Sequence, residues 1–200
     1  MKLKLHVRDR NPQVVIALRR AFADLAGTGA FEAGVGDIFD DAACDAVLSP
    51  ANSFGYMDGG IDLAYRNRFG HALEASVQSQ IRNHHHGELP VGQAFVVPTG
   101  DVPIRFLVVA PTMRVPMNVA KTTHAYLAFR AALIAISRFN DDKPRIASLL
   151  TPGLCTSIGQ MDPLVAAGQM RAAWNAIVEG KRLVRPQDAR DSQRSLEGHH

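Results

Sequence analysis

The residues best suited to chemistry lie in one short stretch, from Asp45 to Gly70. An amide, Asn52, is followed by the glycine pair Gly59-Gly60 and then by a carboxylate, Asp62. A polar loop of this kind before a helix aims free backbone N–H groups and the positive end of the helix dipole at whatever occupies the loop. An anionic ligand, above all a phosphate, is the natural occupant of such a loop.

The elements that must hold this loop are indicated by the residues on either side of it. Ala46-Val47-Leu48 is a short apolar run of the kind that fills a buried strand. After the glycine pair, apolar residues recur with helical spacing up to Gly70, a typical helix stop, at Ile61, Ala64, Tyr65 and Phe69. The same pattern also suits a glycine pair that serves only as a tight connection between a strand and a helix.

A second turn-rich loop follows another apolar run. Residues 146–150 predict a buried strand that continues directly into residues 151–161, Thr-Pro-Gly-Leu-Cys-Thr-Ser-Ile-Gly-Gln-Met. Asp162-Pro163 then predicts the capped start of a final helix, which carries the single tryptophan, Trp174. No charged residue or histidine adjoins Cys155 in the sequence, so we interpret it as a small buried hydrophobe rather than a nucleophile.

The rest of the chain alternates predicted strands and helices. Residues 2–7 alternate polar and apolar side chains, which predicts a strand with Leu3, Leu5 and Val7 in the core. Asn11-Pro12 predicts the start of a helix. Further strands are expected at 30–35, 92–98 and 105–111, and further helices at 72–81 and 121–139. This alternation predicts an α/β fold, a three-layer α/β/α sandwich.

Length and composition limit the classes of protein to which the chain can belong. The chain has 200 residues, a net charge of +3 and two cysteines distant in sequence. We expect one domain over residues 1–184 and a polar, solvated tail over 185–200 whose last five residues resemble a tag remnant. No membrane span or signal peptide is evident, and the cysteines form no disulfide framework, which predicts a cytoplasmic protein. Three adjacent histidines at 84–86 cannot all face one metal, so we expect no metal site there.

Three motifs together resemble the macrodomain family of ADP-ribose-binding modules. Ser-Pro-Ala-Asn-Ser followed by Met-Asp-Gly-Gly-Ile-Asp, residues 49–53 and 57–62, resembles the first ligand loop of the family. Gly36-Asp37-Ile38 resembles a motif that lies some way before that loop. Gly153, Thr156, Ile158 and Gly159 match the second phosphate-binding loop, Gly-x-x-Thr-Gly-Ile-x-Gly, whereas Ser157 stands where many members have glycine.

The resemblance implies a mixed sheet and assigns a role to individual residues. Asp37, on local sequence alone a turn or N-cap aspartate, would accept a hydrogen bond from the adenine amino group. The diphosphate would lie between the two loops, and Met161 would cover the distal ribose. The implied ligand-binding residues are Asp37, Ile38, Ala51, Asn52, Gly59, Gly60, Ile61, Gly153, Thr156, Ser157, Ile158, Gly159 and Met161.

Two classes of function follow from the resemblance. One is an enzyme without a cofactor that releases ADP-ribose from mono-ADP-ribosylated protein or from an ester such as O-acetyl-ADP-ribose. Its catalytic residues would be Asn52 and Asp62, because hydrolytic members carry Gly-Gly-Val-Asp where this chain has Gly-Gly-Ile-Asp. The other is a reader that binds ADP-ribose without cleaving it, in which Asp62 only favours the helix dipole. We expect no membrane partner, and a nucleic-acid partner would need a clustered basic face with aromatics that the sequence does not indicate.

Overall fold

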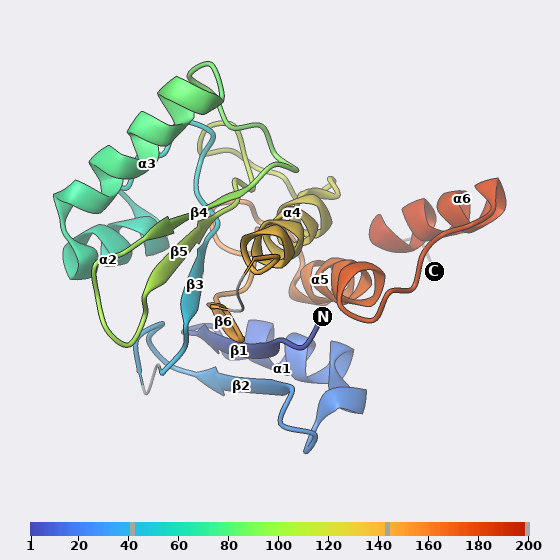
Figure 1. Cartoon of the computed structure of the whole chain (residues 1–200). Coiled ribbons are helices and arrows are strands. Elements are labelled where there is room, and N and C mark those ends of the chain that lie inside the picture. The colour runs from blue at the N-terminus through green and yellow to red at the C-terminus, as the bar shows by residue number, and fades with distance from the viewer. Residues whose placement is uncertain (41–42, 143–144, 199–200) are drawn as a thin grey trace.

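A computed structural model of the protein describes residues 1–40, 43–142 and 145–198. Strands and helices alternate along most of the chain, as Figure 1 shows. The elements in chain order are β1 (Lys4–Asp9), α1 (Pro12–Ala21), the short 3₁₀ turn η1 (Ala23–Leu25), β2 (Phe31–Val35), β3 (Ala46–Ser49), α2 (Gly60–Phe69), α3 (His71–His84), β4 (Phe95–Pro98), β5 (Phe106–Val109), α4 (His124–Phe139), β6 (Ser148–Thr151), α5 (Pro163–Ile177) and α6 (Pro186–Leu196).

The six strands form one mixed sheet in the order β2-β1-β6-β3-β5-β4. Every neighbouring pair is parallel except β4 and β5, which are antiparallel. The predicted mixed sheet is therefore confirmed. Because five strands run in the same direction, their carboxyl ends meet at one edge, where open α/β sheets bind ligands.

Helices cover both faces of the sheet, which confirms the three-layer prediction. On one face α1, α5 and α4 lie side by side, and their apolar side chains pack with Leu5, Val7 and Leu149 of the strands. On the other face α2 and α3 pack Tyr65 and Val77 against the sheet. The β3 strand is buried over its whole length because it contributes alternate side chains to both cores.

Two helix starts follow the predicted capping chemistry. The Asn11 side chain accepts a hydrogen bond from the Gln13 N–H (3.0 Å) at the start of α1. The Asp162 carboxylate accepts one from the Leu164 N–H (2.8 Å) at the start of α5. In both helices proline occupies the first turn, where its missing N–H costs nothing. One predicted start is wrong: the long helix begins at His124, and residues 112–121 belong to an irregular loop.

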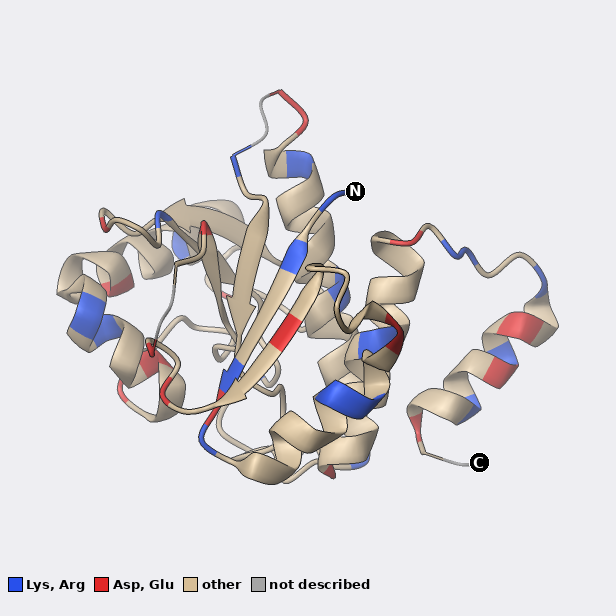
Figure 2. Ribbon diagram, turned by 90° about the horizontal axis from the view of Figure 1, so that it is seen from below, with Lys and Arg blue, Asp and Glu red and all other residues tan. Residues whose placement is uncertain are grey.

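The C-terminal segment differs from the expected solvated tail. It forms the helix α6, whose charges of both signs are interspersed along the ribbon in Figure 2. Leu196 at its end is buried, and the buried Gln169 side chain of α5 donates a hydrogen bond to the Leu196 carbonyl (2.8 Å). One apolar side chain and one amide therefore attach an otherwise polar helix to the domain. Residues 199 and 200, predicted to be part of a tag remnant, lie outside the described residues.

Among the residues that the structure describes, no helix combines the length and the hydropathy needed to span a bilayer. Residues 85 and 86 follow the end of α3 in a turn, and His85 stacks on Phe95 with ring centroids 5.5 Å apart. The described part of the chain contains no group of three or more His, Cys, Asp or Glu side chains arranged to hold a metal ion.

Candidate functional site

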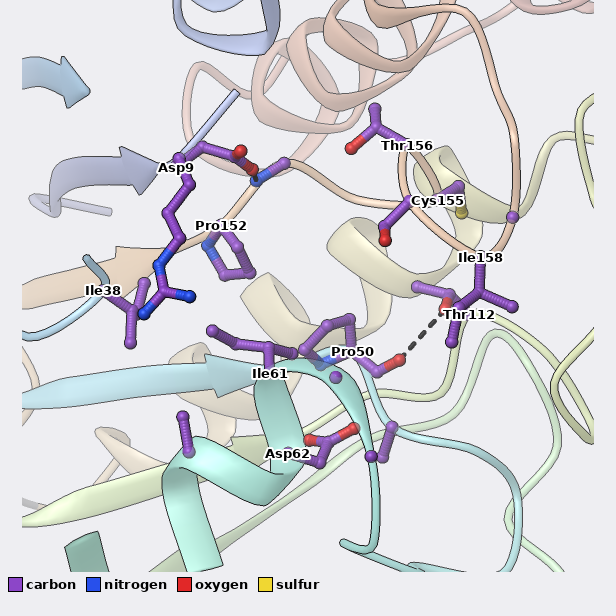
Figure 3. Close-up of a pocket in the computed structure, with 18 of the residues that line it drawn as sticks. Asp9, Ile38, Pro50, Ile61, Asp62, Thr112, Pro152, Cys155, Thr156 and Ile158 are labelled. Carbon is purple, nitrogen blue, oxygen red and sulfur yellow. Dashed lines mark hydrogen bonds between the residues drawn. The ribbon is translucent and has the colours of Figure 1, made fainter. Parts of the chain in front are cut away.

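A cleft of about 560 Å³ lies at the carboxyl edge of the sheet (Figure 3). Each of the five parallel strands sends the segment that follows it to the wall of this cleft. These segments are residues 9–11 at the end of β1, 36–38 after β2, 50–62 after β3, 112–116 after β5 and 152–159 after β6, although not every residue within them lines the wall. The volume falls within the range of about 300–1,000 Å³ that small-molecule sites occupy.

The first loop, between β3 and α2, is anchored at both ends. Its Ser53 N–H donates to the Arg114 carbonyl (3.1 Å), and the Met57 N–H donates to the Glu74 carboxylate of α3 (2.7 Å). Gly60 opens α2 with a φ of +57°, a left-handed conformation that favours glycine. A Cβ placed on Gly60 would meet no heavy atom within 4 Å, so this glycine faces open space in the cleft wall.

The Asn52 side chain shapes this loop. Its Oδ1 accepts hydrogen bonds from the Phe54 N–H (3.0 Å) and the Tyr56 N–H (3.3 Å), and its Nδ2 donates to the Tyr56 carbonyl (2.8 Å). Such a local ring is an Asx-type turn, in which the side chain replaces a backbone turn partner. Asn52 therefore lines the cleft while both polar atoms already serve the loop, and one Nδ2 hydrogen remains for another acceptor.

Asp62 lies in the first turn of α2, as the sequence predicts, and its carboxylate is buried. The hydroxyl of Ser49, itself fully buried at the end of β3, donates to Asp62 Oδ1 (2.5 Å). Burial raises the pKa of Asp62 from 3.8 to about 7, although the Ser49 hydrogen bond works in the opposite direction. Because Asp62 also borders the cleft, a carboxyl group that titrates near neutrality stands at its wall.

The second loop, between β6 and α5, comes very close to its neighbours. A Cβ on Gly153 would lie 2.3 Å from Val14 Cγ1 of α1, and one on Gly159 would lie 2.5 Å from the Cys155 carbonyl oxygen. Both glycines therefore permit an approach that any side chain would prevent. Ser157, which stands where glycine is frequent, is exposed at the cleft wall, and its side chain is accommodated there.

Asp9 links the first strand to the second loop. Its Oδ2 accepts a hydrogen bond from the Gly153 N–H (3.0 Å), and its Oδ1 accepts one from the Asn11 N–H (2.8 Å). The end of β1 thus fixes the beginning of the loop after β6, because these two strands are parallel neighbours in the sheet.

Asp37 lines the cleft and directly precedes Ile38, which Figure 3 shows at the opposite end from Thr112 and Ile158. Its Oδ1 accepts a hydrogen bond from the Phe39 N–H (3.1 Å), and its Oδ2 pairs with the exposed Arg10 guanidinium. The Phe39 hydrogen bond, and then Arg10, hold the pKa of Asp37 below its usual value. Asp37 is therefore ionised at neutral pH, and each oxygen keeps a lone pair for a further donor.

The structure brings nearly all the predicted site residues to this one cleft. Met161 is the exception, because it is buried in the core and does not line the cleft. The predicted position of Met161 over a bound ribose is therefore wrong, and Ile158 is the exposed apolar side chain of the second loop at the cleft wall. The predicted residues that line the cleft are Asp37, Ile38, Ala51, Asn52, Gly59, Gly60, Ile61, Asp62, Gly153, Thr156, Ser157, Ile158 and Gly159.

Two segments of the cleft wall were not predicted from the sequence. Asp9, Arg10 and Asn11 at the end of β1 line the cleft, as do Thr112 and Pro116 of the loop after β5. A signal for the first group was present, since the four polar residues 8–11 follow the predicted strand 2–7 directly, where a parallel sheet collects functional side chains. The second group carries no local signal, because residues 112–116 were expected only to connect a strand and a helix.

Cys155 borders the cleft, but its thiol is not activated as a nucleophile. Its side chain is buried, and burial raises the pKa of the thiol to about 12. The thiol is therefore protonated at neutral pH, in agreement with its interpretation as a small hydrophobe.

The sequence is similar to a protein family and to other proteins of known sequence. A family model described as Macro domain matches residues 48–170. The chain is 28% identical over 137 residues to an uncharacterized protein of Aeropyrum pernix, covering 65% of this chain and 67% of that protein. It is 29% identical over 126 residues to an uncharacterized protein of Aquifex aeolicus, covering 63% and 70%.

Solved structures share the fold. The macrodomain of Mycobacterium tuberculosis DarG superposes with a TM-score of 0.60 at 23% identity, covering 71% of this chain and 88% of that one. A mutant Oceanobacillus iheyensis macrodomain with ADPR gives 0.61 at 18% identity, covering 82% and 89%. Thermosipho africanus DarTG in complex with ADP-ribose gives 0.54 at 13% identity, covering 74% and 38%.

Proposed function

The chain belongs to the Macro domain family, and we propose that it binds ADP-ribose in the cleft at the carboxyl edge of its sheet. The observation that carries the proposal is the pairing of two glycine-containing loops on one cleft, Gly59-Gly60 at the start of α2 and Gly153–Gly159 after β6. Loops of this kind bind diphosphates through backbone N–H groups and a helix dipole. The structures with ADPR and with ADP-ribose that share the fold support the same ligand.

The ends of the cleft suit the two ends of the ligand. Asp37, an ionised acceptor, would receive the adenine amino group, while the diphosphate lies between the loops. The distal ribose would then point toward Asn52 and Asp62, which also line the cleft. No lysine or arginine is needed for the phosphates, because backbone donors carry the partial positive charge.

Calorimetry with free ADP-ribose tests this binding. We expect a 1:1 complex and an increase in melting temperature, because a ligand that binds only the folded state stabilises it. AMP is expected to bind more weakly, since it reaches one end of the cleft only. If millimolar ADP-ribose produces neither heat nor a thermal shift, the proposed function is wrong.

We further propose that the protein hydrolyses ADP-ribose from modified protein side chains or from related esters such as O-acetyl-ADP-ribose. The supporting observation is the buried Asp62 at the cleft wall, whose pKa near 7 is suited to exchanging a proton with water at neutral pH. The one Nδ2 hydrogen that Asn52 retains would hold a ribose hydroxyl while Asp62 orients or deprotonates the water.

Asp62→Ala separates an enzyme from a reader. A positioned general base contributes about 10²- to 10⁴-fold to rate, so the variant should release ADP-ribose from modified protein at least about 100-fold more slowly. Its affinity for free ADP-ribose should change little, because the interaction is used mainly in the transition state. If the parent protein binds modified protein and releases nothing, it is a reader, and Asp62 serves only the helix and Ser49.

A further inference from the structure

Three of the loops that form the cleft carry exposed apolar side chains. Tyr56 and Ile158 line the cleft and are 55% and 52% exposed, and Val115 and Met117, on either side of the cleft residue Pro116, are 43% and 47% exposed. Four of the eleven large apolar side chains that are exposed in the described chain therefore lie on these three loops. We name Tyr56, Val115, Met117 and Ile158 the apolar rim. Single exposed hydrophobes are ordinary, whereas several of them on the loops of one cleft indicate a contact surface.

The backbone holds this group together. The loop after β5 is bonded to the first ligand loop, since the Thr112 N–H donates to the Ala51 carbonyl (3.1 Å) and the Ser53 N–H donates to the Arg114 carbonyl. Its other end is bonded to the second ligand loop through the Val119 N–H and the Gly159 carbonyl (2.9 Å). Residues 112–119 thus bridge both ligand loops, and the rim residues they carry are held in place beside them.

The rim lies where a bound ADP-ribose would leave the cleft. Figure 3 draws Thr112 and Ile158 at the end opposite Ile38, the neighbour of Asp37. With the adenine at Asp37, the distal ribose faces this end, so whatever the ribose is attached to must continue over the rim. The rim is thus continuous with the ligand site and meets the carrier of the ADP-ribose group.

We propose that the apolar rim binds the segment of a modified protein next to its ADP-ribose group, and that this segment carries apolar side chains. This inference rests on the proposed ADP-ribose binding and names the kind of carrier that the site prefers. Burial of apolar surface against the rim supplies an affinity that free ADP-ribose lacks.

The charges at the rim favour a peptide over a nucleic acid. Arg114 is the one basic residue of segment 112–118, and its guanidinium donates to both oxygens of Glu88 (2.8 and 3.0 Å). The same guanidinium lies 5.1 Å from the centre of the Phe54 ring. Recognition of a phosphate backbone draws on several available cations, and this one is already paired.

Three conjugates test the proposal, each carrying ADP-ribose through a thioglycosidic bond that resists hydrolysis. The first is a peptide with Leu, Val and Phe beside the modified residue, the second has Ser and Glu there, and the third is a short single-stranded oligonucleotide. We expect the apolar conjugate to bind about 5- to 20-fold more tightly than free ADP-ribose in calorimetry, and the Ser/Glu conjugate to show no gain.

The double variant Val115→Ser/Met117→Ser should abolish that gain and leave the affinity for free ADP-ribose unchanged, because neither residue lines the cleft. Ile16→Ser on α1, a matched control with 56% exposure, should keep the gain. The proposal is overturned if the apolar conjugate binds no better than free ADP-ribose, if the double variant keeps the gain, or if the oligonucleotide is preferred in a salt-dependent manner. Absence of binding by free ADP-ribose would instead refute the proposed function on which this inference rests.

Discussion

Replacing Asp62 by asparagine is expected to change how the stability of the protein depends on pH. Asparagine has nearly the same shape, and its Oδ1 can still accept the hydrogen bond from the Ser49 hydroxyl, so the packing around α2 is retained. What the substitution removes is a buried group that gains a proton in the folded protein more readily than in the unfolded chain. The sign follows from linkage: stability falls with rising pH wherever the native state holds more protons than the unfolded state.

The magnitude follows from the two pKa values. The carboxyl of Asp62 titrates at 3.8 in the unfolded chain and at about 7 in the native protein. Between these values the native state keeps a proton that the unfolded chain has lost, and each pH unit lowers the free energy of unfolding by about 1.4 kcal/mol. The whole window therefore corresponds to about 4 kcal/mol, of which about 2–3 kcal/mol falls between pH 5 and pH 7.

Urea unfolding of the two proteins at several values from pH 5 to pH 8 measures this difference. The parent protein should lose stability relative to Asp62→Asn up to about pH 7 and run parallel to it above that value. All other titrating groups are shared, so they cancel in the comparison. Asp141→Asn, which changes an exposed carboxylate, is the matched control and should follow the parent. A constant difference between parent and Asp62→Asn across this range would refute the assignment of a raised pKa to Asp62.

Four further substitutions test the two loops and the proposed adenine end. Gly153→Ala forces a Cβ against Val14 of α1, so it should lower the free energy of unfolding by about 1–3 kcal/mol and weaken ADP-ribose binding. An unchanged melting temperature would contradict the close approach of Gly153 to Val14. Gly60→Glu should abolish ADP-ribose binding in calorimetry, because the new carboxylate enters the open space of the cleft, and its circular dichroism spectrum should stay close to that of the parent. If the variant keeps its affinity, the phosphates do not bind at this loop. Asp37→Ala should weaken ADP-ribose binding by about 1–3 kcal/mol. Arg10→Ala should weaken it by less, since Arg10 only holds the carboxylate of Asp37 in place. Equal affinities of the parent protein and Asp37→Ala for ADP-ribose would mean that Asp37 is only a turn residue.

The sequence alone sufficed for the elements whose signals are local. Periodicity and capping residues predicted the strand at β1, the helix starts at Asn11 and Asp162 and the helix α2 between Gly59 and Gly70, and the structure confirms all of them. These signals depend on contacts within a few residues, so they are visible without knowledge of the fold. The alternation of strands and helices likewise predicted the layers.

The candidate site was predictable where short motifs carry it. Asp37, Asn52, the two glycine-containing loops and Asp62 were named from motif resemblance, and the fold brings them to one cleft, although their roles in binding and catalysis remain predictions. Met161 was misplaced because a position within a motif does not say which way a side chain turns. Its side chain is buried in the core.

The tertiary structure alone decided what distant segments do together. The order β2-β1-β6-β3-β5 places the end of β1 beside the second loop, so that Asp9 and Arg10 border a cleft whose motifs begin far along the chain. The bridge between both ligand loops by residues 112–119, and the apolar rim that it presents, also depend on strand order. The raised pKa of Asp62 has the same origin, since burial is produced by packing and not by the identity of its sequence neighbours. Long-range pairing and burial are properties of the whole chain, which is why local sequence patterns do not contain them.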